Sequence, residues 1–158
     1  MSIRSILFIC KANQCRSPAA EAVMRRILAE RGAGARFEID SAGTHEFGNR
    51  SRPLFEAHAA ASRRGYDIPP STARRIGPGD FDRFDLIIAM DKSNADDLRR
   101  FAPTRCKHKI EMLLDYSERF HGRDVPDPIG GDARRFDLAL DMIEDGCRGL
   151  AQLLLRAA

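Results

Sequence analysis

Blocks of apolar residues alternate with amphipathic stretches along the chain, and the two kinds of block predict strands and helices in turn. The first block, Ser5–Cys10, is almost entirely apolar, which is typical of a central parallel strand buried on both faces. After a short loop, apolar residues recur with the spacing of an amphipathic helix that we expect to end near Gly32. These residues are Ala20, Val23, Met24, Ile27 and Leu28.

The alternation continues to the end of the sequence. Three more apolar blocks predict strands, at Phe37–Ser41, Phe84–Met90 and Ile110–Leu114. Helices are expected over Leu54–Arg64 and from Asp91 to Phe101. A last long helix carries apolar residues spaced 4, 3, 4, 3 and 4 apart, at Phe136, Leu140, Ile143, Cys147, Leu150 and Leu154.

Strands that alternate with helices favour a right-handed parallel α/β fold. The 158 residues are enough for one such domain without help from disulfides or metals, and the sequence has no internal repeat or low-complexity linker. We therefore expect a single domain over residues 1–158. The one long irregular stretch, residues 117–131, has a length at which loops in compact domains are often functional.

Composition narrows the class of protein. No apolar run approaches the roughly 18 residues that a membrane span requires, and the start MSIRSILFIC fits a first strand better than a signal peptide, so we expect a cytoplasmic protein without a membrane partner. The net charge is +3, and the arginines fall in scattered pairs rather than in one basic stripe, which argues against nucleic-acid binding. The four cysteines should stay reduced, and none has the spacing of a structural zinc site.

The stretch FICKANQCRSP, residues 8–18, carries the candidate chemistry. A tight loop between a parallel strand and a helix can turn backbone N–H groups inward and add the positive end of the helix dipole, which makes an anion site. Ser17 is the natural cap of that helix, and Pro18 is expected at its first helical position. A cysteine in this field becomes a thiolate, and Arg16 offers a planar fork that matches two oxygens of a phosphate.

Two other interpretations of this stretch are a structural cysteine and a Walker-type phosphate loop. A cysteine at the end of a strand is most often a small core residue, but Arg-Ser-Pro at this spacing favours a nucleophile, Cys10, with an oxyanion clamp. A Walker-type phosphate loop is excluded, because it needs Gly-Lys-Ser/Thr near its end and the only lysine here is Lys11.

At these residues the sequence resembles the low-molecular-weight protein tyrosine phosphatase family, whose loop reads approximately V-C-x-G-N-x-C-R-S-P. The similarity continues in the same order through nearly the whole chain, at Ser41-Ala42-Gly43-Thr44, Ala73-Arg74, Asp85 to Asp91 with Asn94, and Val125-Pro126-Asp127-Pro128. The resemblance implies a three-layer α/β fold, in which helices flank a four-stranded parallel sheet and a phosphate-binding loop follows the first strand.

The resemblance also implies a reaction and its residues. Cys10 would attack phosphorus, Arg16 would hold the phosphate, and Asp127 would act as general acid and then base, with no metal or cofactor. Taken alone, Pro-Asp-Pro would be a surface turn, and its pairing with the cysteine loop is what favours catalysis. The phosphate-binding loop would comprise Lys11, Ala12, Asn13, Gln14, Cys15 and Ser17.

Supporting roles follow from the same resemblance. Asn13 would adopt a left-handed conformation with Ser41 as a hydrogen-bond partner, and Asp91 and Asn94 would order neighbouring loops. Cys15 would either form a protective disulfide with Cys10 or fill space under the loop, and both roles stay open.

The chain departs from the family at several positions. Ala12 replaces the loop glycine, so we expect a negative φ there. Ser71 stands where a histidine is common. Ile129 follows the Asp-Pro pair where aromatic residues often line the cleft, which leaves Phe47 as the candidate aromatic wall. Gln14 matches neither the tyrosine nor the arginine phosphatases of this type, so phosphotyrosine comes first and phosphoarginine second as the expected substrate.

Two other functions remain as alternatives. Arsenate reductase shares the Cys-x5-Arg loop but needs relay cysteines after the third strand, and none is present there. A phosphate-binding module without catalysis would not need Cys10, Arg16, Ser17 and Asp127 together. The expected partner is a tyrosine-phosphorylated protein, with a bacterial-type tyrosine kinase as a further candidate partner, and we expect the protein to be a monomer.

Overall fold

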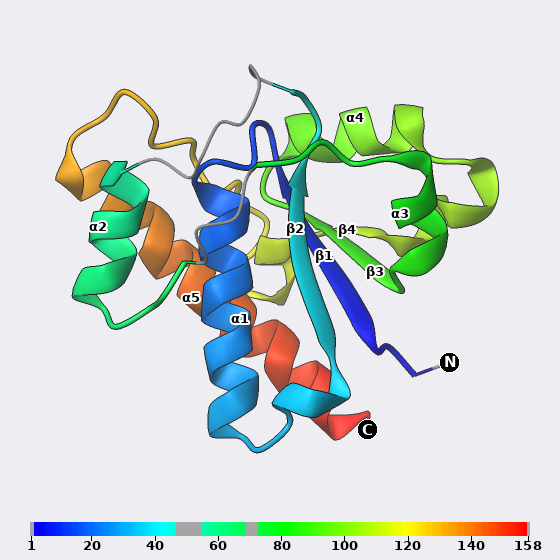
Figure 1. Ribbon diagram of the computed structural model, residues 1–158, viewed down its shortest axis with the longest axis horizontal. Helices are drawn as coiled ribbons and strands as arrows, with labels where there is room; N and C mark the ends of the chain where they lie inside the picture. The colour runs from blue at the N-terminus through cyan, green and yellow to red at the C-terminus, as the bar shows by residue number, and fades with distance from the viewer. Residues whose placement is uncertain (1, 47–54, 69–72, 158) are drawn as a thin grey trace.

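The computed structural model describes residues 2–46, 55–68 and 73–157. Within them, four parallel strands form one sheet in the order β2-β1-β3-β4 (Figure 1). The strands are β1 (Ser5–Cys10), β2 (Glu38–Gly43), β3 (Leu86–Ala89) and β4 (Ile110–Met112). The predicted four-stranded parallel sheet is confirmed, and all four strands lie within two residues of their expected bounds.

Helices cover both faces of the sheet, so the predicted three layers are also confirmed (Figure 1). One layer holds α1 (Arg16–Glu30), α2 (Phe55–Arg63) and α5 (Ala133–Arg156), and the other holds α3 (Pro78–Arg83) and α4 (Lys92–Phe101). Short 3₁₀ helices complete the described chain: η1 (Gly34–Arg36), η2 (Thr104–Lys109) and η3 (Leu113–Tyr116). The sequence pattern predicted none of these three, nor α3.

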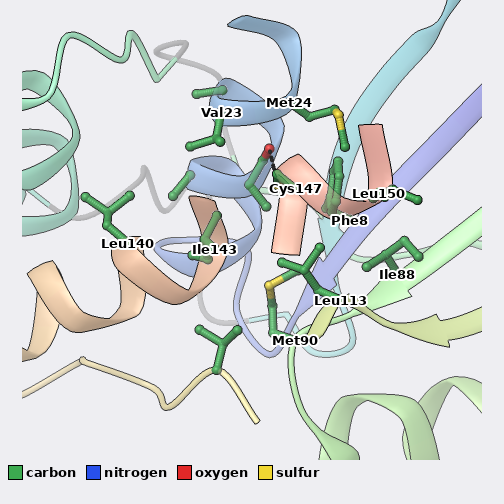
Figure 2. Packing of buried hydrophobic residues seen from close by; sticks show 14 of the residues in the cluster. Phe8, Val23, Met24, Ile88, Met90, Leu113, Leu140, Ile143, Cys147 and Leu150 are labelled. Carbon is green, nitrogen blue, oxygen red and sulfur yellow. Dashed lines mark hydrogen bonds between the residues drawn. The ribbon is translucent and has the colours of Figure 1, made fainter. Parts of the chain in front are cut away.

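The position of β1 in the centre of the sheet explains why its sequence is apolar. Every residue of β1 is buried, because β1 pairs with β2 on one side and β3 on the other and is covered on both faces. Ile6 and Phe8 pack in the layer of α1 and α5, whereas Leu7 and Ile9 pack in the layer of α3 and α4. Figure 2 shows Phe8 among the side chains of the first layer, where the Cys147 thiol donates to the Ala20 carbonyl at 3.8 Å.

Two glycines let α5 lie unusually close to η3. A Cβ atom on Gly149 would stand 1.7 Å from the Tyr116 carbonyl oxygen, and one on Gly146 would stand 2.7 Å from Leu113 Cγ. No other residue type fits at position 149 without a shift of backbone, and one at position 146 would displace the Leu113 side chain.

The register brings the carboxyl ends of the strands to one edge of the sheet. Cys10 is paired with Gly43, and Ile9 with Ala89, so the loops after β1, β2 and β3 start side by side. Both ends of the described chain lie toward the opposite edge (Figure 1). In parallel α/β sheets the edge with the carboxyl ends is where ligands bind. None of the helices in the described ranges is both long and apolar enough to cross a bilayer.

Candidate active site

The loop between β1 and α1, residues 11–15, wraps around the end of β1. Asn13 has a φ of 56° and is the only non-glycine residue with positive φ in the described ranges, so both the left-handed Asn13 and the ordinary φ of Ala12 were predicted correctly. The end of β2 holds the loop from the side, since the His45 N–H donates to the Lys11 carbonyl at 2.9 Å. Gly43 allows this approach, because a Cβ atom there would lie 2.7 Å from the Lys11 oxygen.

The prediction that Ser17 caps helix α1 is wrong. The helix begins at Arg16, with Cys15 in the cap position and no side-chain cap, so Pro18 is its third residue and not its first as predicted. Instead of capping the helix, the buried Ser17 hydroxyl lies inside the loop, 3.1 Å from Cys10 Sγ. The first N–H groups of α1 are thus not taken by a capping side chain, as an anion site at a helix N-terminus requires.

A network of polar side chains surrounds the contact between Ser17 and Cys10, and in it Ser17 can donate to a Cys10 thiolate. The Asn13 amide donates from Nδ2 to Ser17 Oγ at 2.8 Å and to Ser41 Oγ at 3.0 Å, so the predicted contact with Ser41 is confirmed. Ser41 in turn donates to Glu21 at 2.7 Å. Because Ser17 Oγ already accepts from Asn13, its own hydrogen is left for Cys10 Sγ or for the Ala42 carbonyl at 3.3 Å. The network therefore presents a donor to the sulfur, which suits a thiolate.

Arg16 is buried beneath the same loop and is held from two directions. Its side chain is only 3% exposed, and Nη1 donates to Asp91 Oδ2 at 2.7 Å and to the Val125 carbonyl at 2.8 Å. Burial alone would lower the pKa of Arg16, but the negative charges of Cys10 and Asp91 outweigh it and raise the pKa. The guanidinium is therefore a permanent, pre-oriented cation at the edge of the sheet.

Asp91 and Asn94 order the start of α4, as predicted. Asp91 Oδ1 accepts from the Asn94 N–H at 2.8 Å and caps the helix, while Oδ2 holds Arg16. The contact with Arg16 was not predicted, and it links the cap of α4 directly to the Arg16 guanidinium.

Asp127 reaches the site from the long 117–131 segment. The Val125 N–H donates to the Met90 carbonyl at 2.9 Å, which places this segment across the end of β3. Asp127 Oδ2 then lies 3.8 Å from Arg16 Nη2, and its side chain remains 41% exposed. Its Oδ1 accepts from the Ile129 N–H at 3.1 Å. The structure thus brings Asp127 to Cys10 and Arg16, although Asp127 is more than 100 positions from both in the sequence.

The remaining predicted residues lie around this group or outside the described ranges. Lys11 is exposed, Gln14 is half-buried, and Ile129 is exposed on the 117–131 segment. Phe47 and Ser71 lie outside the described residues.

Cys15 is buried and, like Cys10, is a free thiol. Burial, followed by the negative charges of Cys10 and Asp127, raises the pKa of Cys15 to about 12. Cys15 therefore stays protonated at neutral pH and does not compete with Cys10 as a nucleophile.

Two contributors to the site escaped the sequence argument. Glu21 accepts from Ser41, and its only sequence signal is a charged residue four positions after Ser17 on the buried face of α1. Arg74 donates its backbone N–H to Asn13 Oδ1 at 3.1 Å, and no sequence pattern announces a backbone contact of this kind. In the described ranges, no three His, Cys, Asp or Glu side chains gather as a metal site would need.

Comparison with known proteins agrees with this arrangement. The family model described as "Low molecular weight phosphotyrosine protein phosphatase" matches residues 5–158. A putative low molecular weight protein-tyrosine-phosphatase of Synechocystis is 39% identical over 92% of both chains. The solved protein tyrosine phosphatase of Entamoeba histolytica superposes with a TM-score of 0.93 at 33% identity, covering 98% of both chains. A solved YwlE arginine phosphatase superposes with a TM-score of 0.85 at 27% identity, covering 96% of both chains.

The family model spans residues 5–158, which include the loop that holds Cys10 and the segment that holds Asp127. This chain belongs to the low molecular weight phosphotyrosine protein phosphatase family.

Proposed function

We propose that this protein hydrolyses the phosphate ester of tyrosine-phosphorylated proteins, with Cys10 as nucleophile, Arg16 as phosphate clamp and Asp127 as general acid and base. The observation that carries the proposal is the convergence of these three residues on one loop at the carboxyl edge of the sheet. The family assignment supports the same reaction.

The first step forms a cysteinyl-phosphate. Cys10 Sγ donates an electron pair to phosphorus in line with the scissile bond, and the bond from phosphorus to the tyrosine oxygen breaks. Asp127, which must hold a proton at this stage, gives it to the departing oxygen. Arg16 and the loop N–H groups stabilise the charge on the other phosphate oxygens, and because Arg16 is already oriented by Asp91 little reorganisation is needed.

The second step returns the enzyme to its starting state. Asp127, now ionised, takes a proton from a water molecule whose oxygen attacks phosphorus, and the bond from phosphorus to sulfur breaks. Inorganic phosphate leaves and Cys10 is again a thiolate, which the Ser17 hydroxyl can stabilise at 3.1 Å. Because an ionised Cys10 and a protonated Asp127 must coexist, we expect a mildly acidic optimum.

Hydrolysis of p-nitrophenyl phosphate tests the assignment. We expect turnover that vanadate inhibits, complete loss in Cys10→Ser, and a fall of about 10²–10⁴ in kcat for Asp127→Ala. Cys106→Ser and Asp124→Ala serve as matched controls, because Cys106 is a buried cysteine far from the loop and Asp124 is an exposed carboxylate on the same segment as Asp127. Undiminished activity in Cys10→Ser would refute the mechanism.

Phosphoarginine is the second candidate substrate. It is favoured by Ile129, which is 45% exposed where the segment leaves Asp127, and by the match to an arginine phosphatase. Turnover should be compared on two peptides that differ only in carrying phosphotyrosine or phosphoarginine. A higher kcat/KM on the phosphotyrosine peptide is the expected result, and the reverse order would assign the protein to the arginine phosphatases.

A further inference from the structure

Arg74 lies outside the 11–15 loop but contacts it through its backbone. Its N–H donates to Asn13 Oδ1 at 3.1 Å, and its carbonyl accepts from the Gly43 N–H at 2.8 Å. The Ile76 N–H donates back to the Gly43 carbonyl at 2.8 Å. The chain around Arg74 is therefore laid along the end of β2, between that strand and the loop.

The side chain of Arg74 is held by two carboxylates from different elements. Asp80 of α3 accepts from both terminal nitrogens, at 2.9 and 3.1 Å, and Asp40 of β2 accepts at 3.1 Å. The Asp80 side chain is only 9% exposed and also accepts from the Gly77 N–H at 2.7 Å. Two parallel hydrogen bonds to one carboxylate fix both the place and the plane of a guanidinium.

Arg74 and Asp80 stabilise each other's charged forms. Burial alone would raise the pKa of Asp80, but hydrogen bonds from Arg74 and from the Gly77 N–H lower it. For Arg74 the balance is similar: burial lowers its pKa, and the contacts with Asp80 and Asp40 outweigh this and raise it. The Arg74–Asp80 ion pair is thus present at neutral pH.

The position of the Arg74 N–H decides which way the Asn13 amide points. With the amide reversed, Nδ2 would face the Arg74 N–H, and two donors would oppose each other. In the observed orientation Nδ2 faces Ser17 and Ser41 instead. Since Ser17 Oγ accepts from Asn13, its hydrogen can go to a Cys10 thiolate or to the Ala42 carbonyl, and the Arg74 backbone is thus the first of a series of contacts that leads to the sulfur.

We propose that Asp80 and Asp40 are positioning residues for the reaction: by anchoring Arg74 they set the orientation of the Asn13 amide and, through it, the hydroxyl donor to Cys10. The inference rests on the proposed function, in which Cys10 is the nucleophile. Neither carboxylate touches Cys10. Other charged or titratable groups act on this series of contacts: Arg16 and Cys15 interact with Cys10, Asp127 interacts with both of these residues, Glu21 accepts from Ser41, and Arg83 interacts with Asp80.

Alkylation of Cys10 by iodoacetamide as a function of pH tests the inference. In Asp80→Asn we expect the midpoint pH of alkylation to rise by about 0.5–1 unit, the scale of one weakened hydrogen bond to the thiolate. The acid limb of the kcat/KM profile should move in the same direction. Asp80→Glu, which keeps the charge, should recover most of the shift.

Asp82→Asn is the matched control. Asp82 lies on the same helix and also pairs with an arginine, Arg105 at 2.9 Å, but that pair is exposed and makes no contact with the loop. Its midpoint should equal that of the unmodified protein. A shift in Asp82→Asn as large as in Asp80→Asn would overturn the inference, because loss of any carboxylate from α3 would then suffice.

A second position keeps the inference testable if Asp80→Asn folds poorly. Asp40→Asn weakens the same anchor from β2 and should give a smaller rise in the same direction. Unchanged midpoints in folded Asp40→Asn and Asp80→Asn would refute the role of Arg74. Alkylation needs no turnover, so an inactive protein that still shows the shift would refute only the proposed function, and an active protein without the shift would refute only this inference.

Discussion

Asp91 performs two jobs with its two oxygens, and single substitutions can separate them. One oxygen holds Arg16 at 2.7 Å and the other caps α4 through the Asn94 N–H at 2.8 Å. An asparagine in this position keeps a carbonyl oxygen for the cap but loses the charge that orients the guanidinium. Function and stability should therefore respond differently to Asn and to Ala.

For Asp91→Asn we expect kcat/KM on p-nitrophenyl phosphate to fall roughly tenfold, because a charge-assisted hydrogen bond to a buried cation is worth about 1.5–3 kcal/mol and only part of it acts in the transition state. Asp91→Ala should show at least this loss and also lose about 1 kcal/mol of unfolding free energy with the cap. Steady-state kinetics and urea unfolding measure the two effects. Asp132→Ala, which removes the cap of α5, should lower stability alone. Wild-type kcat/KM in Asp91→Asn would contradict the role of the pair.

At the scale of elements, the packing of α5 against η3 depends on two missing side chains. In an open helix, alanine in place of glycine would gain about 1 kcal/mol from helix propensity. At Gly149 the added Cβ atom would stand 1.7 Å from the Tyr116 carbonyl oxygen, a distance that no rotamer can relieve. The steric cost must therefore exceed the gain in propensity.

We expect Gly149→Ala to lower the unfolding free energy by about 2 kcal/mol or more, since overpacking costs typically about 1–3 kcal/mol and this contact is with backbone. Gly79→Ala is the control: it also lies in a helix, and a Cβ atom there meets nothing within 4 Å. That variant should be unchanged or slightly more stable. Urea unfolding measures the stability of both variants. If Gly149→Ala were as stable as Gly79→Ala, α5 and η3 could move apart without a cost in stability.

Elements and residues with a local sequence signal could be predicted, and those that depend on distant contacts could not. The apolar run of β1 and the spacing of Cys10 and Arg16 are local sequence signals, so the sheet and the loop could both be predicted. Helix α3 was missed because its six residues begin with Pro78 and Gly79, which resemble a turn. Ser17 was misassigned because the local capping rule ignores the sulfur 3.1 Å away. The roles of Glu21 and Arg74 depend on contacts between distant segments, which no local pattern records.

At the scale of the whole molecule, carboxylates that join separate segments make stability depend on pH. Asp145 of α5 accepts from the Arg119 N–H at 3.0 Å and from the Ser117 hydroxyl at 2.5 Å. Burial alone would raise the pKa of Asp145, but these hydrogen bonds lower it below its usual range. A carboxyl whose pKa is lower in the folded state stabilises the protein above pH 4 or so, and this contribution disappears as the pH falls through the folded value.

We therefore expect the unfolding free energy to fall as the pH drops from 5 to 3. Asp145→Asn should be less stable than the unmodified protein at pH 7, by about 1 kcal/mol, and the difference should shrink at pH 3. Asp67→Asn, which changes an exposed carboxylate, is the control. Urea unfolding at both pH values gives the comparison, and a difference that grows toward acid would contradict the assignment.

The burial of Arg16 has a thermodynamic consequence beyond catalysis. A permanent cation that is only 3% exposed gains a further anionic partner when an oxyanion occupies the loop, so ligand and fold should stabilise each other. A ligand that binds only the folded chain, at 100 times its Kd, adds about 2.7 kcal/mol, which corresponds to a rise of roughly 5–10 °C in Tm for a protein of this size. Vanadate should give this rise and chloride at equal ionic strength should not. Melting temperature would then report occupancy of the site without any turnover.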